Sequence, residues 1–95
     1  MFLHWGISSV AGVEISKGMF ADRSWDPDRS NFITPSEYWK LAERFNPQRY
    51  DPDRWFAAAR EGGFEYAVLT TKHHDGYCLW PTDFGTFGVK QYMDG

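Results

Sequence analysis

Residues 66–80 read Tyr66-Ala-Val-Leu69 followed by Thr70-Thr-Lys-His-His-Asp-Gly-Tyr-Cys-Leu-Trp80. The centre of the first part is apolar without alternation, which is typical of a parallel strand covered on both faces. A pair of histidines, an aspartate and a glycine then interrupt the apolar pattern. We therefore predict a buried strand over 65–71 that leads into a polar cluster containing His73 and His74.

A second histidine-bearing strand end lies near the N-terminus, where a short strand is predicted over 2–5. Successive side chains of a strand point to opposite faces. Phe2 and His4 therefore share one face of this strand, and Leu3 and Trp5 share the other. Histidines at the ends of two strands indicate one site assembled from both.

The first helix is marked by a capping box at 34–37, Thr-Pro-Ser-Glu, with proline at the first helical position. Pro47 ends this helix, because the residue before a proline avoids the helical conformation. The apolar side chains between these points recur at helical spacing and form one face: Tyr38, Leu41, Ala42 and Phe45.

A second helix is predicted between Asp51 and the pair Gly62-Gly63. Asp51 is a suitable N-cap, and the glycines can adopt the left-handed conformation that ends many helices. The apolar residues of this helix supply a predicted buried face: Trp55, Phe56, Ala58 and Ala59.

The order of strand, long loop, helices and strand is that of a right-handed crossover unit in a parallel sheet, so the predicted fold class is α/β. In barrels and open sheets of this class, active sites lie at the C-terminal ends of the strands. Both histidine positions fall there. The segment 7–33 is predicted to be a loop packed through its apolar residues, with a turn at 25–28.

Length and composition exclude several classes of protein. The 95 residues suffice for one small domain, and the net charge of −3 lacks the basic footprint of a nucleic-acid-binding protein. No apolar run approaches the ~20 residues of a membrane span. Cys78 is the only cysteine, so we predict a small buried side chain and no intramolecular disulfide. The chain opens as though inside a strand, without the features of a signal peptide, so we expect it to be part of a longer protein.

The residues alone leave three roles open for the histidines. Metal ligation by His4, His73 and His74 lacks a supporting motif, because the chain has no His-Glu-x-x-His and no paired cysteines. Hydrogen bonding to a polyhydroxylated ligand suits imidazole, which donates from one ring nitrogen and accepts at the other. The third role is structural, with the histidines satisfying buried backbone groups.

Asp75, Trp5 and Trp80 are each assigned a structural role rather than a role in the site. Asp75-Gly76 predicts a turn, which we favour over a catalytic role for Asp75. Trp5 and Trp80 are assigned to the core rather than to the wall of a sugar pocket.

The sequence contains three longer blocks: Phe2-Leu-His-Trp-Gly6, Tyr38-Trp-Lys-Leu-Ala-Glu-Arg-Phe-Asn-Pro47 and Tyr66-Ala-Val-Leu-Thr-Thr-Lys-His-His-Asp-Gly-Tyr-Cys-Leu-Trp80. In this order and spacing they resemble the alpha-L-fucosidases of glycoside hydrolase family 29. The resemblance covers nearly the whole chain. It implies a (β/α)8 TIM-like barrel, of which residues 1–95 would be a partial glycoside hydrolase catalytic domain with the first strand, the first helical layer and the second strand.

The resemblance also implies an activity, the hydrolysis of terminal alpha-linked L-fucose from glycoconjugates by a retaining exo-glycosidase that needs no cofactor or metal ion. His4 matches the family histidine that ends the first strand, and His73 and His74 match the pair that ends the second. In the family these histidines bind fucose hydroxyls. The family's catalytic aspartate and glutamate come from later segments, so no catalytic residue is assigned to this chain and the fragment alone is expected to be inactive.

Several points stay open at the level of sequence. The family's Glu-Trp pair, which also contacts fucose, is missing from the first loop, where Glu14 and Trp25 are candidates to replace it. The alternative functions are a metal-dependent hydrolase on a similar barrel and a non-catalytic carbohydrate-binding relative. The resemblance is compatible with a secreted, periplasmic or lysosomal location, and the sequence assigns neither a compartment nor an oligomeric state.

Overall fold

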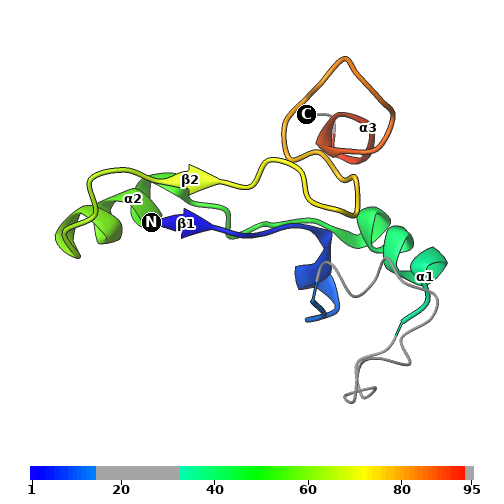
Figure 1. Ribbon diagram of the computed structural model, residues 1–95, viewed down its shortest axis with the longest axis horizontal. Helices are drawn as coiled ribbons and strands as arrows, with labels where there is room; N and C mark the ends of the chain where they lie inside the picture. The colour runs from blue at the N-terminus through cyan, green and yellow to red at the C-terminus, as the bar shows by residue number, and fades with distance from the viewer. Residues whose placement is uncertain (15–32, 94–95) are drawn as a thin grey trace.

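The computed structural model describes residues 1–14 and 33–93 (Figure 1). The predicted turn at 25–28 and the roles considered for Trp25 lie outside these residues. The described elements, in chain order, are β1 (Phe2–Leu3), the 3-10 helix η1 (Ile7–Val10), α1 (Pro35–Trp39), the 3-10 helix η3 (Lys40–Arg44), α2 (Pro52–Glu61), β2 (Val68–Leu69) and α3 (Val89–Tyr92).

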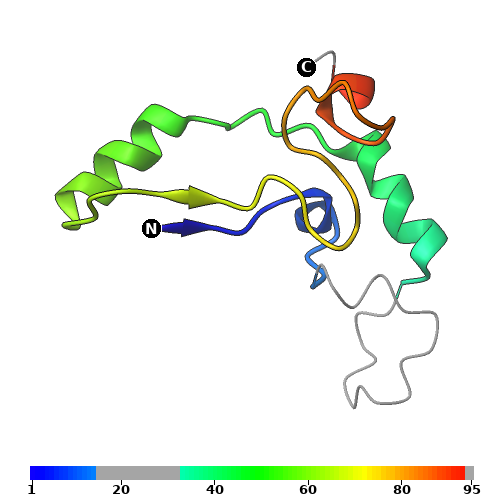
Figure 2. The same ribbon diagram turned by 45° about the horizontal axis from the view of Figure 1, so that its top comes forward.

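The two strands pair in parallel, with Phe2 opposite Val68 and Leu3 opposite Leu69. They lie side by side in both orientations of the ribbon (Figures 1 and 2). The parallel pairing of the sheet confirms the predicted α/β class. Both strands are shorter than the predicted spans 2–5 and 65–71, because each has a single neighbouring strand among the described residues and the ladder is correspondingly brief.

The first helix begins as its sequence predicts. Thr34 Oγ1 accepts a hydrogen bond from the Glu37 amide at 3.3 Å, and Glu37 Oε2 accepts one from the Thr34 amide at 2.9 Å. This reciprocal pair satisfies two amides that the helix itself leaves unpaired. The single helix predicted up to Phe45 instead tightens from α1 into η3, which is common at the C-terminal ends of helices.

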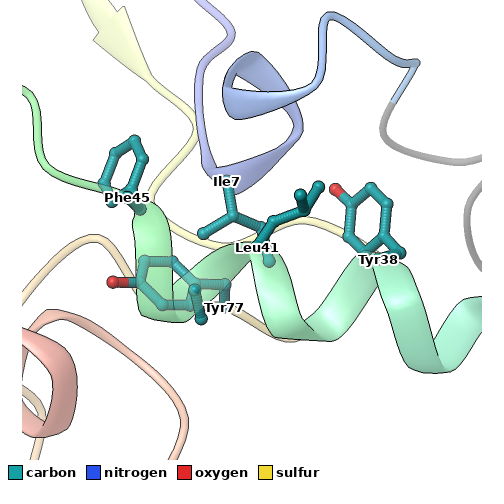
Figure 3. Close-up of a cluster of buried hydrophobic side chains, with 6 residues drawn as sticks. Ile7, Tyr38, Leu41, Phe45 and Tyr77 are labelled. Atoms are coloured by element: carbon teal, nitrogen blue, oxygen red, sulfur yellow. The ribbon is translucent and has the colours of Figure 1, made fainter.

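The predicted apolar face of this helix forms the core. Figure 3 shows it packed against η1 and against the chain that follows β2. Trp5 extends the core, with its ring 5.2 Å from Phe45 and stacked 5.8 Å from Tyr50, as measured between centroids. The core assignment is thus confirmed for Trp5, whereas it is wrong for Trp80, which is 40% exposed. The buried cluster consists of Ile7, Tyr38, Leu41, Ala42, Phe45 and Tyr77.

The second helix has the predicted ends and lacks the predicted buried face. Asp51 Oδ1 accepts from the Arg54 amide at 3.0 Å, and Gly63 has the left-handed φ of 84°. However, α2 has no buried residue, and Phe56 is 49% exposed. Phe56 lines an apolar cavity of about 350 Å³ together with Leu3 and Leu69 of the sheet, so the helix is not packed tightly against the strands there.

The strand 65–71 was expected to be covered on both faces, and this expectation is wrong for the part of the chain that is described. Val68 and Leu69 are 46% and 43% exposed. The Leu69 side faces the cavity under α2, so the helix covers it only partly.

No helix in the described ranges is long and apolar enough to cross a membrane.

The segment after Trp80 contains α3 and pairs with the backbone at Cys78. The Cys78 amide donates to the Phe87 carbonyl at 3.1 Å, and the Val89 amide donates to the Cys78 carbonyl at 3.0 Å. Gly88 lies between these two bonds, and a Cβ atom there would come within 2.7 Å of the Cys78 carbonyl oxygen. Cys78 itself is buried, as predicted.

Candidate functional site

The three histidines of the sequence come together beyond the C-terminal ends of β1 and β2. The ring centroids of His4 and His73 are 4.7 Å apart and the planes are nearly perpendicular at 85°. The rings of His73 and His74 are 4.5 Å apart and tilted by 52°. The expectation that two strand ends would bring these side chains into one place is thereby met, and we refer to the three residues as the histidine cluster.

His4 is placed by the register of the sheet. It directly follows β1, and Thr70 directly follows β2, so the two residues are the next pair after Leu3 and Leu69. Thr70 Oγ1 lies 3.4 Å from His4 Nδ1, and the Phe2 ring stacks on His4 with centroids 6.0 Å apart. Phe2 and His4 share a face, as the alternation predicted. Thr70 was missed by sequence reasoning, and the strand register is the signal that finds it.

His73 and His74 are held in a turn rather than in the strand. The Gly76 amide donates to the His73 carbonyl at 3.0 Å, which closes a four-residue turn over 73–76. Gly76 has a φ of 80°, a conformation that favours glycine. The predicted Asp75-Gly76 turn is confirmed, and because β2 ends at Leu69, the two adjacent histidines are not forced to opposite faces. We call residues 73–76 the histidine turn.

Asp75 does more than shape this turn. It is 6% exposed, and its Oδ2 accepts from the Tyr38 hydroxyl at 2.8 Å while its Oδ1 accepts from the Tyr77 amide at 3.0 Å. Its carbonyl oxygen accepts from Trp39 Nε1 at 3.2 Å. The sequence signal for this network was Tyr38, because a tyrosine on a buried helical face needs a partner for its hydroxyl.

The electrostatics of the cluster keep His73 neutral. Burial is the largest cause that lowers the pKa of His73 below its ordinary value, and the neighbouring His74 and His4 lower it further. The negative charges of Asp75 and Glu14 oppose this shift in the pKa. Glu14, one of the residues considered as a further sugar contact, is exposed, and its negative charge raises the pKa of His73.

The tautomer of His73 follows from its covered nitrogen. His73 Nδ1 is buried and has no hydrogen-bond partner among the described residues. A buried acceptor without a partner is tolerated better than a buried N–H without one. We therefore assign the hydrogen to Nε2, so that His73 is a neutral ring that donates from Nε2.

A metal centre receives no support from this arrangement. Within residues 1–14 and 33–93, no group of three or more His, Cys, Asp or Glu side chains is arranged to hold a metal ion. The His4 and His73 rings instead meet edge to face. What the cluster offers chemically is a set of imidazole donors and acceptors at an open strand end, which suits neutral hydroxyl groups.

Comparison with known proteins places this arrangement in one family. The family described as Alpha-L-fucosidase matches residues 1–93. Alpha-L-fucosidase 1 of Arabidopsis thaliana is 34% identical over 96 aligned residues, covering 98% of this chain and 17% of the plant protein. Tissue alpha-L-fucosidase of Bos taurus is 32% identical, covering 86% of this chain and 19% of the bovine protein.

Solved structures agree with the sequence relatives. An alpha-L-fucosidase GH29 from Bacteroides thetaiotaomicron superposes with a TM-score of 0.71 at 30% identity, covering 97% of this chain and 21% of that one. The Thermotoga maritima alpha-fucosidase in complex with fucose gives a TM-score of 0.70 at 30% identity, covering 95% and 25% of the two chains. The chain thus spans between a sixth and a quarter of the length of these relatives. From the match over residues 1–93, this chain belongs to the alpha-L-fucosidase family.

Proposed function

We propose that residues 1–95 are the first part of the catalytic domain of a retaining exo-glycosidase that hydrolyses terminal alpha-linked L-fucose from glycoconjugates. The domain would be a (β/α)8 barrel in which β1 and β2 are the first two strands. In this proposal His4, His73 and His74 bind hydroxyl groups of the fucose ring. The nucleophilic aspartate and the acid/base glutamate come from segments outside residues 1–95.

The observation that carries this proposal is the convergence of the histidine cluster at the C-terminal ends of adjacent parallel strands. Active sites of barrels built from alternating strands and helices are formed at that end. The face of β1 and β2 that carries His4 is open, since Phe2 is 66% exposed, whereas the opposite face is turned toward α2. This arrangement supports a barrel strand with the helix outside and the substrate beyond the strand end.

The chemistry of the cluster fits a sugar better than a charged ligand. A neutral His73 donates to a hydroxyl oxygen without placing a buried charge beside it, and the lowered pKa of His73 keeps the ring neutral. Hydroxyl contacts of this kind strengthen as the ring distorts toward an oxocarbenium-like transition state. The residues of this chain would therefore orient the sugar and stabilise its distortion, and they would not take part in bond cleavage.

Asp75 is unsuited to nucleophilic attack. Retaining glycosidases place two carboxyl groups about 5–5.5 Å apart across the scissile bond. Both Asp75 oxygens already accept hydrogen bonds, from Tyr38 and from Tyr77, and the side chain is buried. This supports locating the catalytic pair in other segments of the protein.

The test is an assay of the complete polypeptide that contains residues 1–95. We expect release of L-fucose from an aryl alpha-L-fucoside, no hydrolysis of the matching beta-L-fucoside, and a product that first appears in the alpha configuration by proton NMR. Residues 1–95 expressed alone serve as a control and should show no turnover, because they lack the catalytic pair.

Three results would overturn parts of the proposal. A first product in the beta configuration would exclude a retaining mechanism. Binding of fucose without any turnover would identify a non-catalytic carbohydrate-binding relative. Activity that is lost on dialysis against a chelator and restored by added zinc would favour the metal-dependent alternative.

A further inference from the structure

Three buried polar residues, Ser8, Tyr38 and Asp75, come from the three segments that surround the histidine cluster. The Tyr38 hydroxyl donates to Asp75 at 2.8 Å, and the Ser8 side chain lies near enough to the same hydroxyl to lower the pKa of Tyr38. All three residues are buried, at 6% exposure for Ser8, 0% for Tyr38 and 6% for Asp75. Ser8 lies in η1 shortly after His4, Tyr38 lies in α1, and Asp75 lies in the histidine turn. These residues therefore bring both histidine-bearing segments against one helix, and the hydrogen bonds of Asp75 fix the histidine turn to it.

Among these buried residues, Asp75 accepts three hydrogen bonds. Its two carboxylate oxygens accept from different elements, the Tyr38 side chain of α1 and the Tyr77 amide just after the turn. Its backbone oxygen accepts from the indole of Trp39, one residue further along α1. Two of these three bonds come from α1 and one from the residue that follows the turn, so they fix the turn against the helix.

We infer that Asp75 is a positioning residue, whose buried carboxylate fixes the histidine turn onto α1 and thereby holds His73 and His74 where they meet the sugar. The inference rests on the proposed function for the meaning of that position. Asp75 itself touches no substrate in this account. It acts through the two rings that directly precede it in the chain.

The choice of a carboxylate follows from the donors around it. A carboxylate only accepts, so it can receive the tyrosine hydroxyl and the amide together. An asparagine keeps one accepting oxygen for the Tyr77 amide, and its NH2 group can donate to the Tyr38 oxygen if the hydroxyl rotates. A leucine of similar size keeps neither bond. Asparagine should therefore preserve most of the geometry, and leucine should release the turn.

The first experiment measures kcat/KM and Tm of Asp75→Leu and Asp75→Asn in the complete polypeptide, with an aryl alpha-L-fucoside as substrate. Releasing the turn should lower kcat/KM by about a hundredfold in Asp75→Leu, the loss that a misplacement of about 1 Å produces. Asp75→Asn should lose much less than Asp75→Leu, because its side-chain oxygen still accepts from the Tyr77 amide. Leu41→Ala is the matched control, because it removes a buried side chain next to the same helix and should lower Tm with kcat/KM near the wild-type value.

The second experiment separates positioning from general destabilisation. Asp75→Leu is combined with the double variant His73→Phe/His74→Phe. If Asp75 acts through the histidines, its effect on kcat/KM should largely disappear in this background while its effect on Tm persists. Losses in kcat/KM that multiply would overturn the inference. Restoration of an inactive Asp75→Asn by azide would also overturn it, because that result would identify Asp75 as the nucleophile.

A third measurement does not depend on activity. Histidine ring signals in proton NMR should show the contact between the His4 and His73 rings in the wild type and in Asp75→Asn, and should lose it in Asp75→Leu. Tyr38→Phe, which removes only one bond to Asp75, replaces Asp75→Leu if the latter fails to fold. If the wild type hydrolyses the fucoside and the ring contact survives in the variants, the positioning role is wrong and the proposed function stands. If the wild type is inactive and the ring contact is lost in the variants, the proposed function is wrong and the positioning role stands.

Discussion

The ring of His73 meets the ring of His4 at nearly a right angle, with centroids 4.7 Å apart, although the two residues come from the ends of different strands. The two rings are in edge-to-face contact, so a displacement of either ring would change this contact. The contact therefore couples the two halves of the proposed site. The loss of either histidine should remove its own hydrogen bond and also change the position of the other ring.

Replacing His73 or His74 by phenylalanine, which preserves the bulk of the ring, should lower kcat/KM for an alpha-L-fucoside. A buried polar group left without its partner costs about 1–3 kcal/mol. At about 1.36 kcal/mol per decade, the expected loss is roughly fivefold to 150-fold. Steady-state kinetics of the complete polypeptide, with folding checked by circular dichroism, measures this loss.

The matched control for these variants is a set of deoxy-fucosides, each lacking one ring hydroxyl. With the substrate that lacks the partner hydroxyl, kcat/KM should differ much less between wild type and variant than it does with the parent fucoside, because the contact is already absent. If the two losses multiply for every deoxy-fucoside, the histidines do not bind the sugar and a structural role replaces the proposed one.

The stability of the folded protein should depend on pH through His73. Its pKa in the folded state is lowered from the ordinary value of 6.5, mainly by burial, so the unfolded chain takes up a proton first as the pH falls. The contribution of neutral His73 is therefore complete above pH 6.5 and is lost as the pH falls through the lowered pKa. We expect the free energy of unfolding, measured with urea between about pH 4 and 8, to decline toward acid pH, because histidines titrate in about this range. The decline should be less steep in His73→Phe. An equal slope in both proteins would contradict the assignment.

Tyr38→Phe should lower the free energy of unfolding because it leaves Asp75 Oδ2 buried without its donor. The expected loss is about 1–3 kcal/mol. Tyr66→Phe is the control, since that tyrosine is 76% exposed. Its effect should lie within about 0.5 kcal/mol of zero. Chemical denaturation of the complete polypeptide compares the two, and equal effects would show that the buried hydroxyl bond adds no stability.

Gly88→Ala should destabilise the pairing of the C-terminal segment with Cys78. The added methyl group would lie 2.7 Å from a backbone oxygen that cannot move aside freely. Overpacking of this kind costs about 1–3 kcal/mol. Gly6→Ala is a close control, because Gly6 has a similarly extended φ of 169° and open space around the new methyl group. We expect Tm to fall in Gly88→Ala and to change little in Gly6→Ala, and the reverse order would contradict the tight approach at Cys78.

The local part of the fold could be predicted because the signals are local. The capping box at Thr34, the N-cap at Asp51 and the turn before Gly76 each depend on residues within a few positions of one another, and each is confirmed. The convergence of the histidines could also be predicted, since parallel strand ends meet at one edge of a sheet.

The remaining features depend on contacts between distant segments. The bond from Tyr38 to Asp75 joins α1 to the histidine turn, and no spacing in the sequence announces such a pair. The burial of Phe56 and Val68 was overestimated for a related reason, because an apolar side chain is buried only where another layer is present to cover it. Trp80 illustrates the same point, since its size alone predicted the core and its surroundings left it 40% exposed.

The parallel pairing of β1 with β2 also sets the order of events when the protein is made. A parallel neighbour cannot be reached through a tight hairpin, and the bond from the Met1 amine to the Tyr66 carbonyl spans 65 positions. At about 5–20 residues per second, the ribosome needs roughly 3–13 s to add that much chain. The half of the site that carries His4 is thus synthesised and left without its strand partner for seconds, and it can be completed only after the half with His73 and His74 has followed.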